Sequence, residues 1–442
     1  MFGSVYNTFN ELTATHARSL LISGSLTPDV LVSSCRERIE NREDDVEAWQ
    51  HLDWLNVERQ LSTLSQQPIE KRGLLWGLPV SIKDIFDTFD MPTSYGSKIY
   101  AGFRPVADAA CVSRLRAAGA IIMGKSVSTE FAYWQAGKTK HPNDAARSPG
   151  GSSSGSAAAV SDYMVPLAIG SQTAASTIRP AAYCGIVGYK PTRGMISLAG
   201  VKALANGLDT VGMFGRCVSD IALIASVMAN RPDLASIAPI KEEPNVRLWM
   251  GPEWDKASKG ANLALEKTLQ LIVEKGAHVG RDTVPDPFTQ LCEAQTIIMA
   301  VEAARELSHE RYTAYDKLSI SLHELFALAD GTVSSDYDDA YQLRDYCLHN
   351  LEQIFGDADV LVLPSAPDVA PLSQAGTGDP VMSRAWTLLG LPSITVPCGT
   401  NASGLSYGIQ LAARPRRDVQ LLQVAKWFED ALVGQKNEVI AS

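Results

Sequence analysis

Short apolar runs alternate with amphipathic segments along most of the chain, and this alternation predicts strands separated by helices. Runs bounded by glycine or proline are typical of buried strands, and they lie within residues 71–87 and at 120–123, 165–169, 277–281, 360–363 and 393–396. Helical spacing marks residues 28–40, 107–118, 155–163, 220–229, 261–274 and 418–433. Thr27 and Pro28 supply an N-cap and a first-turn proline, while Gly119 and Gly276 follow helix ends. The order of these elements indicates an α/β fold.

Two stretches interrupt the alternation. Residues 230–244 are rich in proline and polar side chains, which indicates a break after a first part of the core. Residues 288–355 are mostly helical in pattern and rich in charge. We expect this stretch to form a helical cap beside a pocket and to set substrate choice.

Composition narrows the class of protein. The 442 residues are 45% apolar and 20% charged, as in ordinary globular proteins, and the net charge of −10 disfavours nucleic-acid binding. The longest apolar run, residues 157–169, is interrupted by Asp162, so we expect no membrane span. The N-terminus does not resemble a signal peptide. The seven cysteines and seven histidines are dispersed, which predicts a cytoplasmic protein without a metal or cofactor.

Two turns built from small residues dominate the middle of the chain. The first is Gly150-Gly151-Ser152-Ser153-Ser154-Gly155, and the second is Gln172-Thr173-Ala174-Ala175-Ser176 followed by Arg179-Pro180. Such segments are most often linkers, but here a helix-like run and a short apolar run separate them. Small residues let backbone N–H groups approach a ligand, and serines on such turns are candidates for a nucleophile and a proton relay.

These turns resemble the signature region of the amidase signature family of serine hydrolases. The segments 77–84 (GLPVSIKD) and 390–399 (GLPSITVPCG) resemble the lysine motif and the C-terminal strand motif of the same family, in the family's order. The resemblance implies a single α/β/α domain over residues 1–442, with a large mixed central sheet flanked by helices. We place its core at about 60–230 and 356–442, and a helical insertion at about 231–355.

The resemblance also implies a Ser-Ser-Lys triad for cleaving C–N bonds. Ser176 matches the nucleophile, Ser152 the bridging serine and Lys83 the general base. The backbone amides of Thr173, Ala174, Ala175 and Ser176 match the oxyanion hole. A free lysine has a pKa of about 10.4, so Lys83 must be buried to act as a base. In a strand Asp84 points away from Lys83 and leaves it unpaired.

Three positions differ from the family pattern and bear on the shape of the turn. Ala174 and Ala175 occupy positions where glycine is common, and alanine tolerates a positive φ poorly. Gln172 occupies a position where an acidic residue is frequent. We expect these differences to affect substrate scope more than the type of reaction.

The substrate is predicted from the side chains that could line a pocket. Phe131, Tyr133 and Trp134 cluster upstream of the first turn, and the helical insertion offers further aromatic side chains, namely Phe326, Tyr337, Tyr341 and Tyr346. Charged residues are sparse near the turns. We therefore expect small, neutral or aryl-bearing carboxamides as substrates, with esters and carbamates (urethanes) also reacting.

Two alternatives remain open. Residues 151–155 formally match G-x-S-x-G, which would make Ser153 the nucleophile of a Ser-His-Asp hydrolase, although a loop rather than a strand precedes it. The chain could instead be an amidotransferase subunit that acts with a partner. On the preferred interpretation we expect a monomer or homodimer that binds a small molecule and neither nucleic acid nor membrane.

Overall fold

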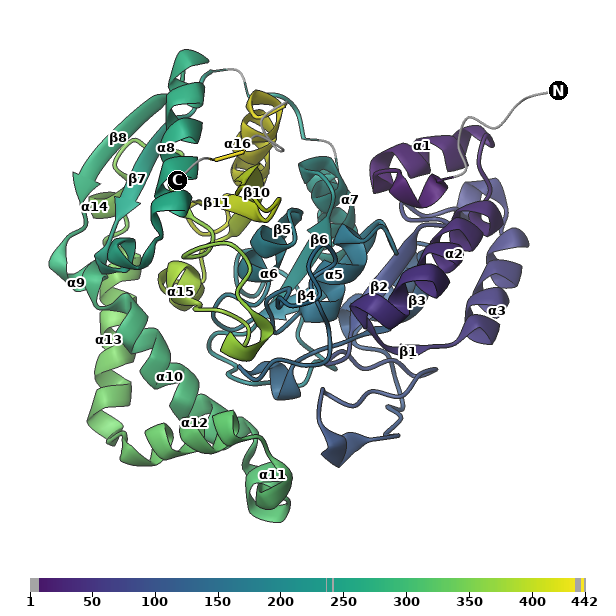
Figure 1. Cartoon of the computed structure of the whole chain (residues 1–442), viewed down its shortest axis with the longest axis horizontal. Coiled ribbons are helices and arrows are strands. Elements are labelled where there is room, and N and C mark those ends of the chain that lie inside the picture. The colour runs from purple at the N-terminus through teal and green to yellow at the C-terminus, as the bar shows by residue number, and fades with distance from the viewer. Residues whose placement is uncertain (1–7, 236, 241, 434–438, 441–442) are drawn as a thin grey trace.

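The computed structural model describes residues 8–235, 237–240, 242–433 and 439–440, and its centre is one mixed sheet with helices on both faces (Figure 1). The 11 strands follow the order β1-β3-β2-β4-β6-β5-β10-β11-β9-β7-β8. Their bounds are β1 (Trp49–Leu52), β2 (Pro79–Lys83), β3 (Ile121–Ser126), β4 (Leu167–Gln172), β5 (Val187–Lys190), β6 (Thr210–Gly215), β7 (Asn245–Met250), β8 (His278–Thr283), β9 (Val360–Pro364), β10 (Ser393–Thr400) and β11 (Ser406–Ala412).

One part of the sheet has parallel pairing, which brings the ends of three strands together. Strand β2 lies between β3 and β4 and runs parallel to both, so the carboxyl ends of these three strands meet at one edge. From β4 to β9 the pairing is antiparallel, and β7 is parallel to both β9 and β8. The α/β prediction is confirmed, and all six predicted strands are present.

Helices cover both faces of the sheet. Helices α5 and α6 contact one another and pack on β2–β4 and on β5, β10 and β11, respectively. Helix α7 contacts α1, α4 and α16, and α16 contacts α8, so these form the other layer. The helices are α1 (Ala14–Ser23), α2 (Pro28–Val46), α3 (Trp54–Ser65), α4 (Ala110–Ala117), α5 (Ser154–Ser161), α6 (Ile178–Tyr183), α7 (Val218–Met228), α8 (Lys259–Glu274), α9 (Asp286–Thr289), α10 (Leu291–Glu306), α11 (Ser308–Thr313), α12 (Ile320–Gly331), α13 (Ser334–His349), α14 (Glu352–Phe355), α15 (Val381–Leu388) and α16 (Asp418–Ala431).

In the structure the core begins before residue 60, and the helical arm begins after residue 283 rather than at about 231. Strand β1 pairs with β3, so the core includes residues before 60. Strands β7 and β8 belong to the central sheet, and α8 packs on β9–β11, so residues 245–283 are core rather than insertion. Buried Val246 and Leu248 alternate with the less buried Asn245 and Arg247, a pattern that the polar surroundings concealed. The helical arm comprises α9–α14, and α10–α13 extend from the body at the lower left of Figure 1.

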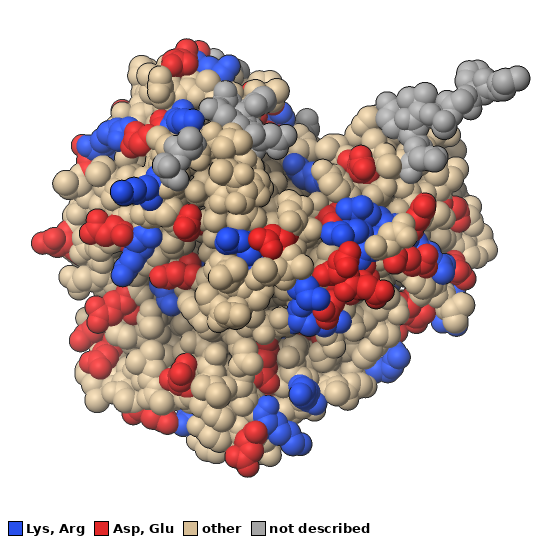
Figure 2. Space-filling view, viewed as in Figure 1, with Lys and Arg blue, Asp and Glu red and all other residues tan. Residues whose placement is uncertain are grey.

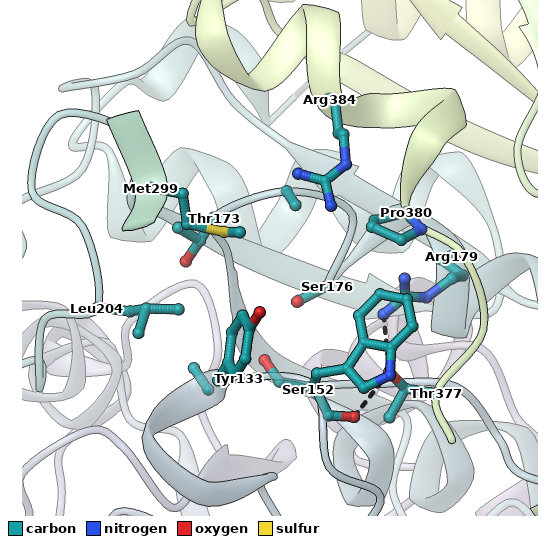
Figure 3. A pocket seen from close by; sticks show the side chains of 13 residues that line it. Tyr133, Ser152, Thr173, Ser176, Arg179, Leu204, Met299, Thr377, Pro380 and Arg384 are labelled. Atoms are coloured by element: carbon teal, nitrogen blue, oxygen red, sulfur yellow. Dashed lines mark hydrogen bonds between the residues drawn. The ribbon is translucent and has the colours of Figure 1, made fainter. Parts of the chain in front are cut away.

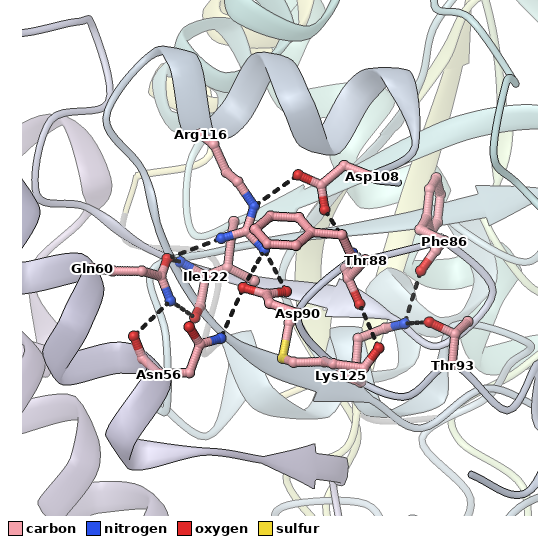
Figure 4. A network of polar contacts seen from close by, with 12 residues as sticks. Asn56, Gln60, Phe86, Thr88, Asp90, Thr93, Asp108, Arg116, Ile122 and Lys125 are labelled. Carbon is pink, nitrogen blue, oxygen red and sulfur yellow. Dashed lines mark hydrogen bonds and ion pairs between the residues drawn. The ribbon is translucent and has the colours of Figure 1, made fainter. Parts of the chain in front are cut away.

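A polar network holds the loop that follows β2 (Figure 4). The guanidinium of Arg116 on α4 donates to Asp108 at 2.9 Å and to both carboxylate oxygens of Asp90 at 2.7 and 2.8 Å. Asn56 on α3 donates to the same Asp90 at 2.9 Å. These bonds fasten the loop to two helices, and thereby support the end of β2 that carries Lys83.

The face shown in Figure 2 carries basic and acidic side chains interspersed rather than one basic patch. None of the described helices combines the length and apolar character needed to cross a membrane.

Candidate active site

Lys83 lies at the carboxyl end of β2, inside the protein. Its side chain is completely buried, and Nζ donates to Ser152 Oγ at 2.7 Å and to Ser171 Oγ at 2.9 Å. Ser171 comes from β4, the parallel neighbour of β2, and Ser152 from the turn before α5. The parallel pairing of β2 and β4 thus places Lys83 beside Ser171, and the turn before α5 brings Ser152 to the same amine.

The electrostatic environment makes Lys83 a base near neutral pH. Burial lowers the pKa of its ammonium to about 7, and the charge of buried Asp209 opposes that shift. No described carboxylate lies within 4.0 Å of Nζ. As predicted, Asp84 is directed elsewhere: its carboxylate lies 3.2 Å from Lys125 Nζ and accepts hydrogen bonds from Ser94.

Ser152 and Ser176 both line a small cavity beside Lys83 (Figure 3). The peptide bond between Gly151 and Ser152 is cis. The Gly151 carbonyl accepts a hydrogen bond from Arg179 at 2.7 Å, which fixes the turn against α6. Ser176 lies on the second turn, between β4 and α6, with 7% of its surface exposed. The structure thus brings together the three residues that the sequence placed in the triad.

The turn from Thr173 to Ser176 is anchored through its carbonyl groups. Gln295 on α10 donates to the Thr173 carbonyl at 2.9 Å, and Thr387 on α15 donates to the Ala174 carbonyl at 2.6 Å. Among the described residues, none accepts a hydrogen bond from the four backbone N–H groups of this turn. Free donors on an anchored turn are what an oxyanion hole requires.

The departures from the family pattern have a structural explanation. Neither Ala174 nor Ala175 has a positive φ, so alanine fits both positions without left-handed strain. Gln172 Oε1 accepts hydrogen bonds from the amides of Thr177 and Ile178 at 3.0 and 3.1 Å, while its Nε2 donates to Thr387 at 3.0 Å. A carboxylate at position 172 could accept these bonds but could not donate the third.

The cavity is small and only partly matches the predicted lining. It encloses about 350 Å³, its open mouth included. Tyr133 and Trp134 line it as predicted, but Phe131 does not: it is buried and packs edge-on against Tyr100, at a ring distance of 6.2 Å. The four aromatic residues suggested from the insertion are also absent from the lining, where the helical arm contributes Met299.

Two charged side chains reach the cavity, although charged residues are sparse in the sequence near the two turns. Arg179 on α6 and Arg384 on α15 both line the cavity. The sequence concealed Arg384 because it lies 208 positions after Ser176 and reaches the site only through the packing of α15 on α10.

The Ser153 alternative finds no support in the geometry. Ser153 is buried, and its hydroxyl lies 3.3 Å from both the backbone N and O of Ser171 in β4. It precedes α5 without a strand running into it, and it does not line the cavity.

Comparison with known proteins identifies the family. The family model described as Amidase matches residues 30–422. The chain belongs to this family, the amidase signature enzymes. An amidase signature enzyme cleaves C–N bonds, and the Ser-Ser-Lys triad is typical of the family.

The similar proteins include both amidases and components of amidotransferases. The chain is 31% identical to a glutamyl-tRNA(Gln) amidotransferase subunit of Natranaerobius thermophilus, over 97% of each chain. It superposes on the crystal structure of an amidase with a TM-score of 0.87 and 27% identity, covering 95% of this chain and 100% of the other. The corresponding glutamyl-tRNA(Gln) amidotransferase subunit from Thermotoga maritima gives a TM-score of 0.76 and 25% identity, covering 96% and 95%.

Several residues of this amidase signature site were missed by the sequence analysis. Gln295 and Thr387 hold the second turn from distant helices, and Asp209 accepts a hydrogen bond from Thr173 Oγ1 at 2.5 Å. Burial raises the pKa of Asp209 to about 6. Each lies more than 30 positions from the turn it contacts, so local patterns give no signal for it.

Proposed function

We propose that this enzyme hydrolyses the C–N bond of a small carboxamide through an acyl-enzyme at Ser176. The observation that carries the proposal is the buried Lys83, whose amine contacts Ser152 at 2.7 Å and whose pKa burial lowers to about 7. A lysine with an ordinary pKa of about 10.4 would be almost wholly protonated at neutral pH. Here about half of the molecules hold a neutral amine at pH 7, ready to accept a proton.

The proposed reaction begins with attack of Ser176 Oγ on the amide carbon. As the C–O bond forms, the Ser176 proton passes to Ser152, and the Ser152 proton passes to neutral Lys83. The resulting ammonium returns a proton through Ser152 to the departing nitrogen, which leaves as the C–N bond breaks. Water then attacks the acyl-enzyme, and the same relay takes its proton and restores Ser176.

The turn from Thr173 to Ser176 is proposed to stabilise the oxyanion of both tetrahedral intermediates. Its four free N–H groups belong to a segment held from three directions, by Gln172, Gln295 and Thr387. Donors fixed in place before the reaction need little reorganisation when the negative charge develops.

The size of the cavity limits the substrate. The space of about 350 Å³ includes open solvent at the mouth, and the centre of a water molecule can move through only about 30 Å³ of it, so the site suits only a small acyl group. The serine chemistry accepts other leaving groups, so esters and carbamates of the same acyl group are proposed as additional substrates.

A second candidate function is that of a component of an amidotransferase, and the names of the curated relatives favour it. The 31% identity with the Natranaerobius thermophilus protein extends along nearly the whole of both chains. However, the 479 aligned positions exceed the 442 residues of this chain, so that relative contains segments absent here. The amidase structure also superposes better than the Thermotoga maritima structure, with TM-scores of 0.87 and 0.76. We therefore place free-standing hydrolysis first, with the enzyme acting as a cytoplasmic monomer or homodimer.

The test compares the purified chain and Ser176→Ala on primary amides, anilides, esters and carbamates, with ammonia or amine release as the readout. Ser176-dependent turnover by the chain alone supports the first candidate. The second is tested by adding the partner proteins of an amidotransferase and measuring amide transfer to glutamyl-tRNA. Transfer that needs this chain, without turnover of any free amide, would replace the first candidate with the second.

A further inference from the structure

Arg384 places a positive charge on the cavity that the proposed reaction does not use. It lies on α15, lines the same space as Ser176, and Figure 3 shows its guanidinium directed toward that serine. The side chain is partly buried, and burial lowers the pKa of its guanidinium. A cation withdrawn from water is costly unless an anion or several oxygen atoms compensate it.

The protein compensates this charge only in part. Nη1 donates to Gln295 Oε1 and to Thr296 Oγ1, the latter at 2.9 Å. Nη2 and Nε donate to none of the described residues, and no described carboxylate lies within 4.0 Å of the guanidinium. The face left open by these contacts can make the paired hydrogen bonds by which arginine binds a carboxylate.

The other arginine on the cavity is occupied. Arg179 donates from Nη1 to the Gly378 carbonyl and from Nη2 to the Gly151 carbonyl, both at 2.7 Å. Nη2 also reaches Thr377 Oγ1 at 3.2 Å. Both terminal nitrogens of Arg179 therefore tie loops together, whereas Arg384 keeps one terminal nitrogen available.

The remaining lining defines the chemical class of the ligand. None of the side chains lining the cavity is acidic, and those besides the serines, threonines and arginines are apolar or aromatic. They are Ala132, Tyr133, Trp134, Ala174, Leu204, Met299 and Pro380. This apolar lining suits a short hydrocarbon segment, whereas a substrate ammonium would find no acidic partner among the lining residues.

We propose that Arg384 binds a carboxylate on the acyl part of the substrate, so that the preferred substrates are short amides of dicarboxylic acids. This inference rests on the proposed function, because it names the substrate class of the same site. It replaces the neutral or aryl-bearing amides expected from the sequence.

Two matched pairs of substrates test the inference. Succinamate carries a carboxylate, while 4-oxopentanamide carries a methyl ketone in its place. We expect kcat/KM for succinamate to exceed that for 4-oxopentanamide by about tenfold to a hundredfold, the range for a charge-assisted contact. Glutaramate is L-glutamine without the ammonium, and we expect the enzyme to prefer glutaramate. A ratio of one or less in the first pair, or preference for glutamine in the second, would overturn the inference.

Variants of Arg384 separate binding from support of the fold. Since Arg384 also contacts Gln295, Arg384→Gln should lower kcat/KM for both substrates. A general disturbance of the site affects both values equally and therefore leaves the ratio of the two kcat/KM values unchanged. We expect this variant to bring the ratio close to one, mainly through a higher KM for succinamate. Arg384→Lys should retain part of the preference, and the surface variant Arg36→Gln should retain all of it. An unchanged ratio in Arg384→Gln would contradict the assignment.

A binding measurement distinguishes failure of this inference from failure of the proposed function. Calorimetry of Ser176→Ala with succinamate measures binding without turnover. If 4-oxopentanamide is hydrolysed but succinamate is neither preferred nor bound, only the inference fails. If the wild type hydrolyses neither amide, the proposed function is wrong. If Ser176→Ala also fails to bind succinamate, the inference about Arg384 is wrong as well.

Discussion

The pH dependence of amide hydrolysis should report the ionisation of Lys83. With a pKa of about 7, the neutral fraction is about 9% at pH 6 and about 91% at pH 8, so kcat/KM should rise about tenfold over this interval and then level off. With an ordinary pKa of about 10.4, the rise over the same interval would be about a hundredfold and would continue to pH 10. The two cases therefore differ in both slope and plateau.

The assay is kcat/KM for an uncharged amide between pH 5.5 and about 10, because an uncharged substrate adds no ionisation of its own. Lys83→Met should lower kcat/KM by about 10²- to 10⁴-fold, the usual contribution of a general base, and abolish the rise below pH 8.

Lys190 provides a matched control for this experiment. It is also completely buried, and burial lowers its pKa to about 7, but its Nζ donates to the carbonyls of Pro191 and Leu391 and does not reach Ser152. Lys190→Met should preserve the pH profile of the folded enzyme. A profile that loses its inflection in Lys190→Met but keeps it in Lys83→Met would refute the assignment of the base.

Three further predictions concern the turn, the fold and the buried charge. Gln172→Leu leaves the Thr177 and Ile178 amides without their acceptor. We expect kcat to fall by about tenfold to a hundredfold with little change in KM. Equal effects on kcat and KM would contradict a role for Gln172 in shaping the oxyanion hole. Arg116→Ala removes the ion-pair partner that Asp90 and Asp108 share. We expect the free energy of unfolding, measured by urea titration, to fall by about 3 kcal/mol. A fall of less than about 0.5 kcal/mol would show that the network does not stabilise the fold. Lys83→Met should raise the melting temperature more at pH 6 than at pH 9. Because the pKa of Lys83 is about 7 in the folded state and about 10.5 in the unfolded state, burying its charge destabilises the wild type fully below pH 7. This destabilisation declines as the pH rises from 7 toward 10.5.

Local pattern was sufficient for the strands and turns that hold the triad. Strand β2 ends at Lys83, and β4 is a short apolar run that leads into the turn with Ser176, while the turn with Ser152 precedes α5. Strand β7 was missed because polar Asn245 and Arg247, which are only partly buried, alternate with its buried Val246 and Leu248.

The composition of the cavity could not be predicted in the same way. Arg384 lies on α15, and Gln295 and Met299 lie on α10, so each reaches the cavity through packing between helices far apart in sequence. Phe131 and the aromatic residues of the arm were predicted to line the pocket because they are aromatic and lie near the turns or in the insertion. Phe131, Phe326, Tyr337 and Tyr341 instead pack against other side chains, and Tyr346 is exposed.

The most direct test of the mechanism is the site of covalent labelling by an alkyl fluorophosphonate, followed by intact mass and peptide mapping. We predict one adduct per wild-type chain, located on Ser176, with slower labelling in Lys83→Met and none in Ser176→Ala. Labelling at Ser153 or Ser152, or undiminished labelling of Ser176→Ala, would contradict the assignment of Ser176 as the nucleophile.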